Sequence, residues 1–138
     1  MTIASWQDRE ILPRYAFLES ILSGRRVLEI GAVALTGGRS AKFLLERGAA
    51  HVVAIDADTA AVEAARADAD LAVEDLEFRP ADFAESTEAY DVVLVTDGAD
   101  LDLEADPSQI DALKSWLCEG GRLVLAFRAE GPALAGYD

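Results

Sequence analysis

A single cysteine and a single histidine limit the chemistry that this sequence can support. Cys118 has no second cysteine with which to form an internal disulfide, so we expect a reducing compartment, the cytoplasm. The sequence offers His51 no Ser-His-Asp or Cys-His arrangement, which leaves hydrolase chemistry without support. Residues 97–104 are acidic but lack the order of an EF-hand loop, so we expect a solvated loop and no metal site.

Long apolar runs are also missing. No run approaches the roughly 18 residues of a membrane helix, and the N-terminus has no signal-peptide pattern, so we expect no membrane association. Residues 1–50 carry seven Lys and Arg and five Asp and Glu. Residues 51–138 carry only five Lys and Arg but 21 Asp and Glu. Because polyanion binding depends on Lys and Arg, this balance argues against direct nucleic-acid binding and favours solubility or a basic partner.

The sequence does contain enough apolar material for one folded domain. Of its 138 residues, 51% are hydrophobic and 28% are charged, which is typical of a globular chain and not of a disordered one. We divide this domain into an N-terminal helical segment (1–24), an α/β core (25–128) and a loop tail (129–138).

Residues 25–58 predict a β-α-β unit around which the rest of the chain is organised. Its parts, in order, are a strand (26–30), a glycine-bearing turn (31–38), a helix (40–47) and a strand (51–55). In open parallel sheets, small molecules bind beyond the carboxyl ends of the strands. Glu29, Gly31 and Asp56 lie at such ends and are therefore candidate ligand-binding residues.

The remainder of the chain continues the alternation of strands and helices. Asp58 predicts the start of an alanine-rich helix, and Asp106 followed by Pro107 predicts another, which we expect Gly120 and Gly121 to end. The further expected elements are helices over 5–23, over 59–67 and after 106, and strands over 76–79, 91–95 and 123–127. Five strands with helices between them predict an α/β fold with a doubly wound, Rossmann-like parallel sheet.

Six short pieces of the chain carry a resemblance to a known family: VLEIG (27–31), TGG (36–38), VVAID (52–56), ADF (81–83), YDVVLV (90–95) and LKSWLCEGGRLVLAF (113–127). In this order and spacing they make residues 25–128 resemble the class I S-adenosylmethionine-dependent methyltransferases. The resemblance implies a strand order of 3-2-1-4-5, S-adenosylmethionine as cofactor, and methyl transfer to an unidentified acceptor. It names no catalytic side chain, because positioning of the acceptor can supply most of the catalysis.

The resemblance also implies the cofactor-binding residues, which are Glu29, Gly31, Gly37, Asp56, Asp82 and Phe83. Glu29 and Gly31 would shape the methionine pocket, and Asp56 would bond the ribose hydroxyls, since a carboxylate accepts several hydrogen bonds. Asp82 would face the adenine amine, and Phe83 would contact the ring. The residues by themselves leave alternatives open: Glu29 and Asp56 could simply accept backbone N–H bonds, and Phe83 could belong to the core.

Two departures from the family pattern support a second hypothesis. The middle glycine of the turn is absent: Leu35 takes its place, where a side chain could close the pocket, and Val33 and Ala34 look like an insertion. The family sheet continues after its fifth strand, whereas this chain ends about ten residues later, which leaves an apolar strand edge. We therefore expect part of a longer protein, or a protein partner or second copy that covers this edge. An inactive module for docking, regulation or self-association is the alternative to an enzyme.

Overall fold

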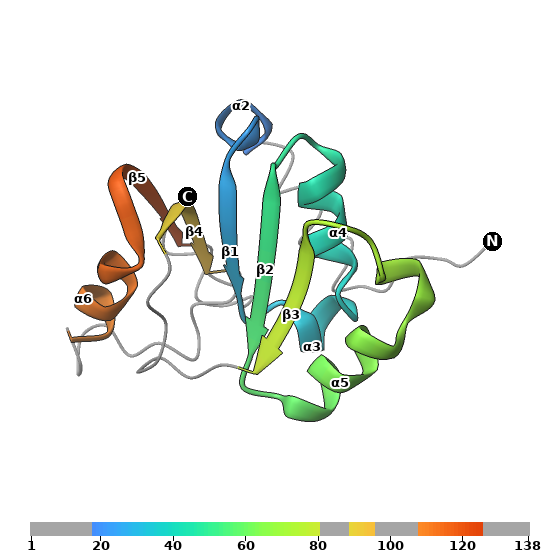
Figure 1. The fold of residues 1–138 in the computed structure, drawn as a ribbon. Coiled ribbons are helices and arrows are strands. Elements are labelled where there is room, and N and C mark those ends of the chain that lie inside the picture. The colour runs from blue at the N-terminus through green and yellow to red at the C-terminus, as the bar shows by residue number, and fades with distance from the viewer. Residues whose placement is uncertain (1–17, 81–88, 96–107, 126–138) are drawn as a thin grey trace, which may run out of the picture.

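The chain forms one five-stranded parallel sheet with helices beside it (Figure 1). The computed structural model describes residues 18–80, 89–95 and 108–125. The strands are β1 (Arg26–Ile30), β2 (His51–Asp56), β3 (Leu76–Pro80), β4 (Tyr90–Val95) and β5 (Leu117–Leu125). Their order, β3-β2-β1-β4-β5, and their parallel pairing confirm the doubly wound, Rossmann-like α/β fold that the sequence predicts.

The helices are short and, apart from α2, which precedes β1, they lie between successive strands. They are α2 (Glu19–Leu22), α3 (Val33–Thr36), α4 (Arg39–Glu46), α5 (Thr59–Ala67), the 3₁₀ turn η1 (Ala69–Leu71) and α6 (Ser108–Ser115). Helix α5 has the expected bounds, and the Asp58 carboxylate accepts the Ala61 N–H at 3.0 Å, as an N-cap does. Helix α2 lies within the segment expected to be helical over 5–23, of which residues 5–17 lie outside the described residues. Among the described residues, no helix is both long and apolar enough to cross a membrane.

The fifth strand is where the structure corrects the sequence prediction. We expected a helix ending at Gly120 and Gly121 and a strand over 123–127, but α6 ends at Ser115 and β5 begins at Leu117. The glycine pair lies within β5, where the register with β4 shifts as in a β-bulge. Gly120 has φ 78°, which glycine adopts without steric cost, so the pair permits a bulge and does not end a helix. The last two residues expected in the strand lie outside the described residues.

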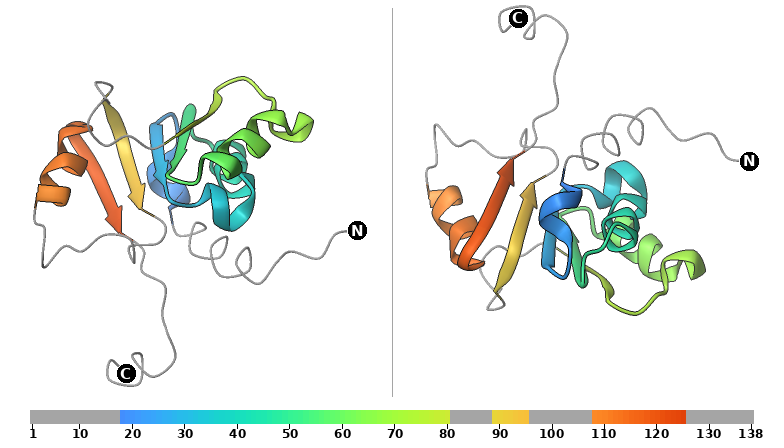
Figure 2. Two further views of the ribbon diagram at one scale, coloured as in Figure 1. Left: turned by 90° about the horizontal axis from the view of Figure 1, so that it is seen from below. Right: turned by 90° about the horizontal axis from the view of Figure 1, so that it is seen from above.

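Each face of the sheet packs against its own apolar cluster, because successive strand residues point to opposite faces. Val27 of β1 belongs to the cluster under α3, α4 and α5, whereas the next residue, Leu28, belongs to the cluster on the α6 side. Figure 2 shows α6 beside β5, apart from the group formed by α3, α4 and α5. Burial on both faces explains why β1, β2 and β4 are nearly continuous apolar runs in the sequence.

Asp91 ties together the beginnings of β1, β4 and β5. Its Oδ2 accepts the backbone N–H of Arg26 at 2.8 Å, and its Oδ1 accepts the thiol of Cys118 at 3.2 Å. The Arg26 bond, followed by the Cys118 bond, lowers the pKa of Asp91, and the same carboxylate raises the pKa of Cys118. Cys118 is half-buried within β5 and not part of the helix that was expected to end at Gly120; its raised pKa favours the protonated thiol, which is the less reactive form.

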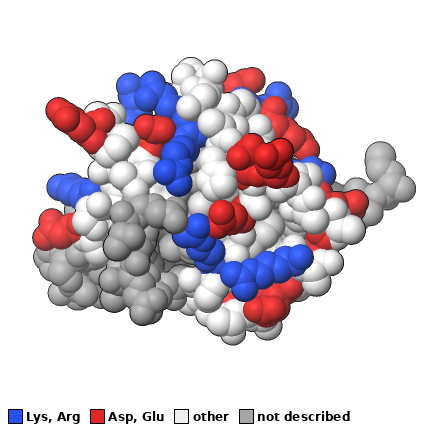
Figure 3. All heavy atoms as spheres, in the orientation of Figure 1, with Lys and Arg blue, Asp and Glu red and all other residues white. Residues whose placement is uncertain are grey.

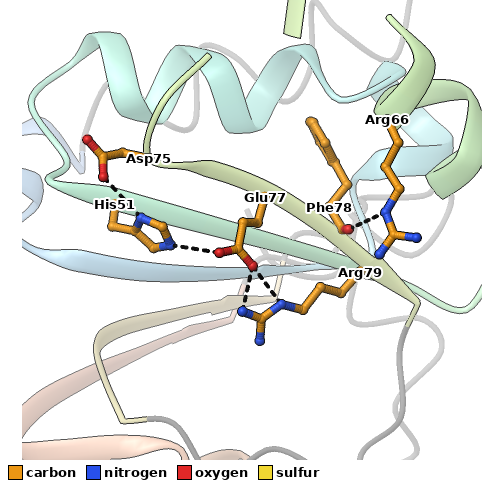
Figure 4. A network of polar contacts seen from close by, with 6 residues as sticks. All are labelled: His51, Arg66, Asp75, Glu77, Phe78 and Arg79. Atoms are coloured by element: carbon orange, nitrogen blue, oxygen red, sulfur yellow. Dashed lines mark hydrogen bonds and ion pairs between the residues drawn. The ribbon is translucent and has the colours of Figure 1, made fainter. Parts of the chain in front are cut away.

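A network of polar side chains joins the edge strand β3 to β2 (Figure 4). His51, the first residue of β2, lies between two carboxylates: Nδ1 is 3.4 Å from Asp75 Oδ1, and Nε2 is 3.7 Å from Glu77 Oε1. Arg79 Nε donates to Glu77 Oε2 at 2.8 Å. Contacts as exposed as these stabilise a fold by at most about 1 kcal/mol each. His51 therefore has a structural contact at the amino ends of the strands, away from the expected ligand site.

The outer edge of β3 is partly closed by helix α5. Arg66 Nε donates to the carbonyl oxygen of Phe78 at 2.8 Å, and Pro80 ends the strand without an N–H that would need an acceptor. A groove of about 340 Å³ lies here between α5, η1 and β3. It is two strands away from the switch point between β1 and β4, so it is not where this fold binds its ligands.

Candidate functional site

The candidate site lies at the carboxyl ends of β1 and β2, beside the switch point of the sheet. Glu29 is near the end of β1, and Asp56 is the last residue of β2. The N–H of Gly31, the first residue of the turn after β1, donates to the Ile55 carbonyl at 3.0 Å. The structure thus brings the turn and Asp56 together at the edge where open α/β sheets bind ligands.

The Asp56 carboxylate is held by backbone N–H groups on both of its oxygens. Oδ2 accepts the Ala34 N–H at 2.9 Å, and Oδ1 accepts the Asp58 N–H at 2.9 Å. The residue is 8% exposed. A carboxylate offers about four acceptor positions; backbone N–H groups take one on each oxygen, and burial restricts access to the others. Its structural role is therefore established, and its contact with a ribose stays a prediction.

Glu29 is fully buried within the sheet. In register it lies between Ala54 of β2 and Leu94 of β4, both of which belong to the cluster under α3, α4 and α5. Burial of a carboxylate is costly unless it is compensated by specific interactions, so a glutamate at this position needs a particular environment. The structure places Glu29 next to the start of the turn as the sequence predicts, and its contact with a cofactor stays a prediction.

The turn after β1 is more ordered than the sequence indicates, because it contains helix α3. Thr36 organises the junction with α4: its hydroxyl donates to the Ala32 carbonyl at 3.0 Å and lies 2.9 Å from the Ser40 hydroxyl. The Ser40 N–H donates to the same threonine oxygen at 3.2 Å. Sequence reasoning missed this buried pair, although the four-residue spacing of the two hydroxyls on either side of two glycines was a usable signal.

The inserted residues of the turn contribute to the core. Val33 is fully buried in the cluster under α3, α4 and α5, and Leu35 is half-buried against the same cluster. Gly37 ends α3 with φ 67°, and a Cβ at this position would meet no atom within 4 Å. The two apolar side chains thus pack against the domain, while no described residue blocks the backbone at Gly37.

Several predicted residues lie outside the part of the chain that the structure describes. Asp82 and Phe83, expected at the adenine, belong to this group, and so does the acidic stretch 97–104. Their roles stay predictions. Of the residues expected to bind the cofactor, the structure describes Glu29, Gly31, Gly37 and Asp56, which lie on β1, on β2 and in the turn after β1.

Comparison with known proteins identifies the family. A family model described as "Methyltransferase domain" matches residues 28–125, which is most of the core expected over 25–128. Among curated proteins, no significant sequence match is found.

Three solved structures with similar folds are larger proteins than this chain. A S-adenosylmethionine-dependent methyltransferase from Thiobacillus denitrificans in complex with S-adenosylhomocysteine has 24% identity and a TM-score of 0.63, over 82% of this chain and 47% of that one. A glycopeptide N-methyltransferase has 21% identity and a TM-score of 0.65, and the match covers 86% of this chain and 52% of that one. Coclaurine N-methyltransferase has 20% identity and a TM-score of 0.61, and the match covers 86% of this chain and 35% of that one. At these identities the likeness shows the fold, and this chain spans about half or less of each of these proteins.

Proposed function

This chain belongs to the methyltransferase domain family, and from that membership we propose that it binds S-adenosylmethionine and transfers the methyl group to an acceptor nucleophile. The family match and the strand order confirm the resemblance to class I S-adenosylmethionine-dependent methyltransferases that six short sequence pieces carry. The activity, the acceptor and the partners of the whole protein are part of the proposal.

The observation that best supports the proposal is the position of Asp56 beside the glycine turn. Asp56 ends β2, and its neighbour Ile55 accepts the Gly31 N–H, so carboxylate and turn lie side by side. A carboxylate can bond both hydroxyls of a ribose. A Cβ at Gly31 or Gly37 would meet no atom of the described residues within 4 Å, so the described part of the chain leaves the backbone of both glycines open to a ligand.

Methyl transfer can proceed with little acid-base catalysis by the protein's own side chains. S-adenosylmethionine supplies an electrophilic methyl group on a sulfonium sulfur; the acceptor forms a bond to the methyl carbon as the carbon–sulfur bond breaks, leaving S-adenosylhomocysteine. The chain's residues would hold the ribose and the methionine part so that the methyl group is in line with the acceptor. Such positioning can supply a large part of the rate enhancement without a catalytic side chain.

Calorimetric titration with S-adenosylhomocysteine tests the proposal. We expect micromolar binding to the unchanged protein and at least about tenfold weaker binding to Asp56→Ala, which loses a charged hydrogen-bond acceptor. Asp58→Ala is the matched control, because it removes a carboxylate two residues away that caps α5 from an exposed position. No heat at millimolar ligand with the unchanged protein would overturn the proposal and favour the inactive module.

A partner at the outer edge of β5 is a separate proposal. In the described part of the chain, β5 pairs with β4 alone, and Leu117 and Leu123 are only half-buried. An edge of this kind can pair with a further strand, which we propose comes from a protein partner or a second copy. Sedimentation velocity should then show self-association, or a stable complex when the partner is added; a monomer with no partner would contradict it.

The charge distribution bears on the acceptor. On the face shown in Figure 3, acidic side chains are interspersed with the Lys and Arg side chains, and residues 51–138 carry 21 Asp and Glu against five Lys and Arg, so neither this face nor the charge balance offers a mainly basic surface. Direct binding of a nucleic acid depends on such a surface, and we therefore propose a small-molecule or protein acceptor. The single cysteine keeps the cytoplasm as the proposed compartment.

A further inference from the structure

The turn after β1 donates a hydrogen bond to the Asp56 carboxylate, which is also the group expected to bind the ligand. Oδ2 accepts the Ala34 N–H, and Oδ1 accepts the Asp58 N–H, each at 2.9 Å. The Asp58 bond is local, because it spans two residues, whereas Ala34 lies 22 residues earlier in the chain. Of these two bonds, the one from Ala34 therefore joins the turn after β1 to the end of β2.

Ala34 can make this bond because its N–H lies in the first turn of α3. The first N–H groups of a helix have no acceptor within the helix. Further along α3, the Thr36 and Gly37 N–H groups donate to the Ala32 and Val33 carbonyls at 2.9 and 2.8 Å. The side chain of Ala34 is exposed, so the contact with Asp56 is made by the backbone amide and does not depend on side-chain packing.

Glycines with left-handed backbone lie on both sides of α3. Gly31 has φ 85° and Gly37 has φ 67°, and a Cβ at either would meet no atom within 4 Å. Val33 anchors the inner side of α3 in the core. Because glycine adopts a wide range of φ and ψ, Gly31 and Gly37 are the positions at which the backbone can rotate to move the Ala34 amide away from Asp56.

We propose that the Ala34 amide is an internal competitor for the Asp56 carboxylate: it occupies the carboxylate in the ligand-free protein, and a ribose diol binds by displacing it. The identity of the ligand rests on the proposed function. A diol needs access to both carboxylate oxygens, but Asp56 is only 8% exposed and its Oδ2 is held against the turn by the Ala34 amide. Because the ligand replaces an existing bond, its affinity is lower than the same carboxylate would give without the Ala34 amide.

Amide exchange in the unchanged protein tests the displacement directly. The hydrogen exchange of the Ala34 amide is measured by NMR with and without saturating S-adenosylhomocysteine, and the Asp58 amide, bonded to the same carboxylate, is the internal reference. We expect the ligand to accelerate exchange at Ala34 by at least about tenfold and to leave Asp58 unchanged. Protection of Ala34 that stays the same or increases would overturn the proposal.

Ala34→Pro tests the energetic consequence, because proline removes the N–H and is tolerated in the first turn of a helix. We expect this variant to bind S-adenosylhomocysteine about tenfold more tightly than the unchanged protein. Ala34→Ser keeps the amide and is the control, with unchanged affinity. Weaker binding by a folded Ala34→Pro variant would overturn the competition. If this variant does not fold, the exchange measurement on the unchanged protein decides.

The two proposals fail in different ways. If the unchanged protein and every variant give no binding heat with S-adenosylhomocysteine, the proposed function is wrong. Displacement of the Ala34 amide by this ligand is then wrong as well. If S-adenosylhomocysteine binds and the Ala34 amide stays protected, the proposed function stands and the competition is wrong.

Discussion

Replacement of Gly38 by alanine should destabilise the fold much more than the same change at the preceding residue. Gly38 joins α3 to α4 with φ 91°, and a Cβ there would lie 2.8 Å from Leu71 Cδ1 and 2.9 Å from the ring of Phe78. Gly37 has φ 67°, but its Cβ would meet no atom within 4 Å. The pair of variants therefore separates backbone strain, which both share, from steric overlap, which only Gly38→Ala creates.

The magnitudes follow from these two terms. An L residue in the left-handed region costs roughly 1–2 kcal/mol, and alanine offsets roughly 0.4–1 kcal/mol of this by restricting the unfolded chain. Gly37→Ala should therefore lower the free energy of unfolding by about 1 kcal/mol. Overlap with the buried Leu71 and Phe78 adds roughly 1–3 kcal/mol, so Gly38→Ala should lose about 2–4 kcal/mol. That is a large part of the roughly 5–15 kcal/mol that keeps a domain folded.

Urea denaturation followed by circular dichroism measures both variants under the same conditions. The midpoint should fall clearly further for Gly38→Ala than for Gly37→Ala, while the slope with urea stays the same. Equal losses would mean that Leu71 and Phe78 move aside at no cost, and the close packing of the α3–α4 junction against β3 would be refuted.

Three further outcomes are expected. Asp58→Ala removes the acceptor of the Ala61 N–H and should lower the free energy of unfolding by about 1 kcal/mol in the same titration, with a smaller loss for Asp58→Asn. The bond from Arg26 lowers the pKa of Asp91, so this carboxylate stabilises the fold above its ordinary pKa and loses that contribution as pH falls through the lowered value. The urea midpoint should therefore drop less between neutral pH and about pH 3 in Asp91→Asn than in the unchanged protein. Because Asp91 raises the pKa of Cys118, the thiol should react slowly with iodoacetamide, and Asp91→Asn should accelerate the reaction; equal rates would contradict the bond.

Local signals explain which elements could be predicted. The helix over 59–67 has the expected bounds because its cap, Asp58, and its alanine-rich composition act within a few residues. The strand over 26–30 was equally well predicted from its apolar run. Gly120 and Gly121 misled the prediction, because a glycine pair is compatible with a helix end and with a bulge. The pairing of β5 with β4 decides between a helix end and a bulge, and the residues next to the glycine pair do not predict that pairing.

The same distinction applies to the candidate site. The positions of Gly31 and Asp56 could be predicted, because each follows an apolar strand and parallel strands end at the same edge. The hydrogen bond from the Ala34 amide to Asp56 could not be predicted, since it joins residues that are 22 positions apart in the sequence. The sequence also left open whether Leu35 would close the pocket; the structure packs it against the core cluster.

The amino-acid sequence alone determined the α/β class, most strand limits and the carboxylate at the end of β2, because apolar periodicity, caps and turn residues act over short distances. Only the tertiary structure decided what that carboxylate contacts and how the insertion after β1 is used. The physical reason is that α3 takes its position from packing against α4, α5 and β2, and this packing brings its first-turn amide to Asp56.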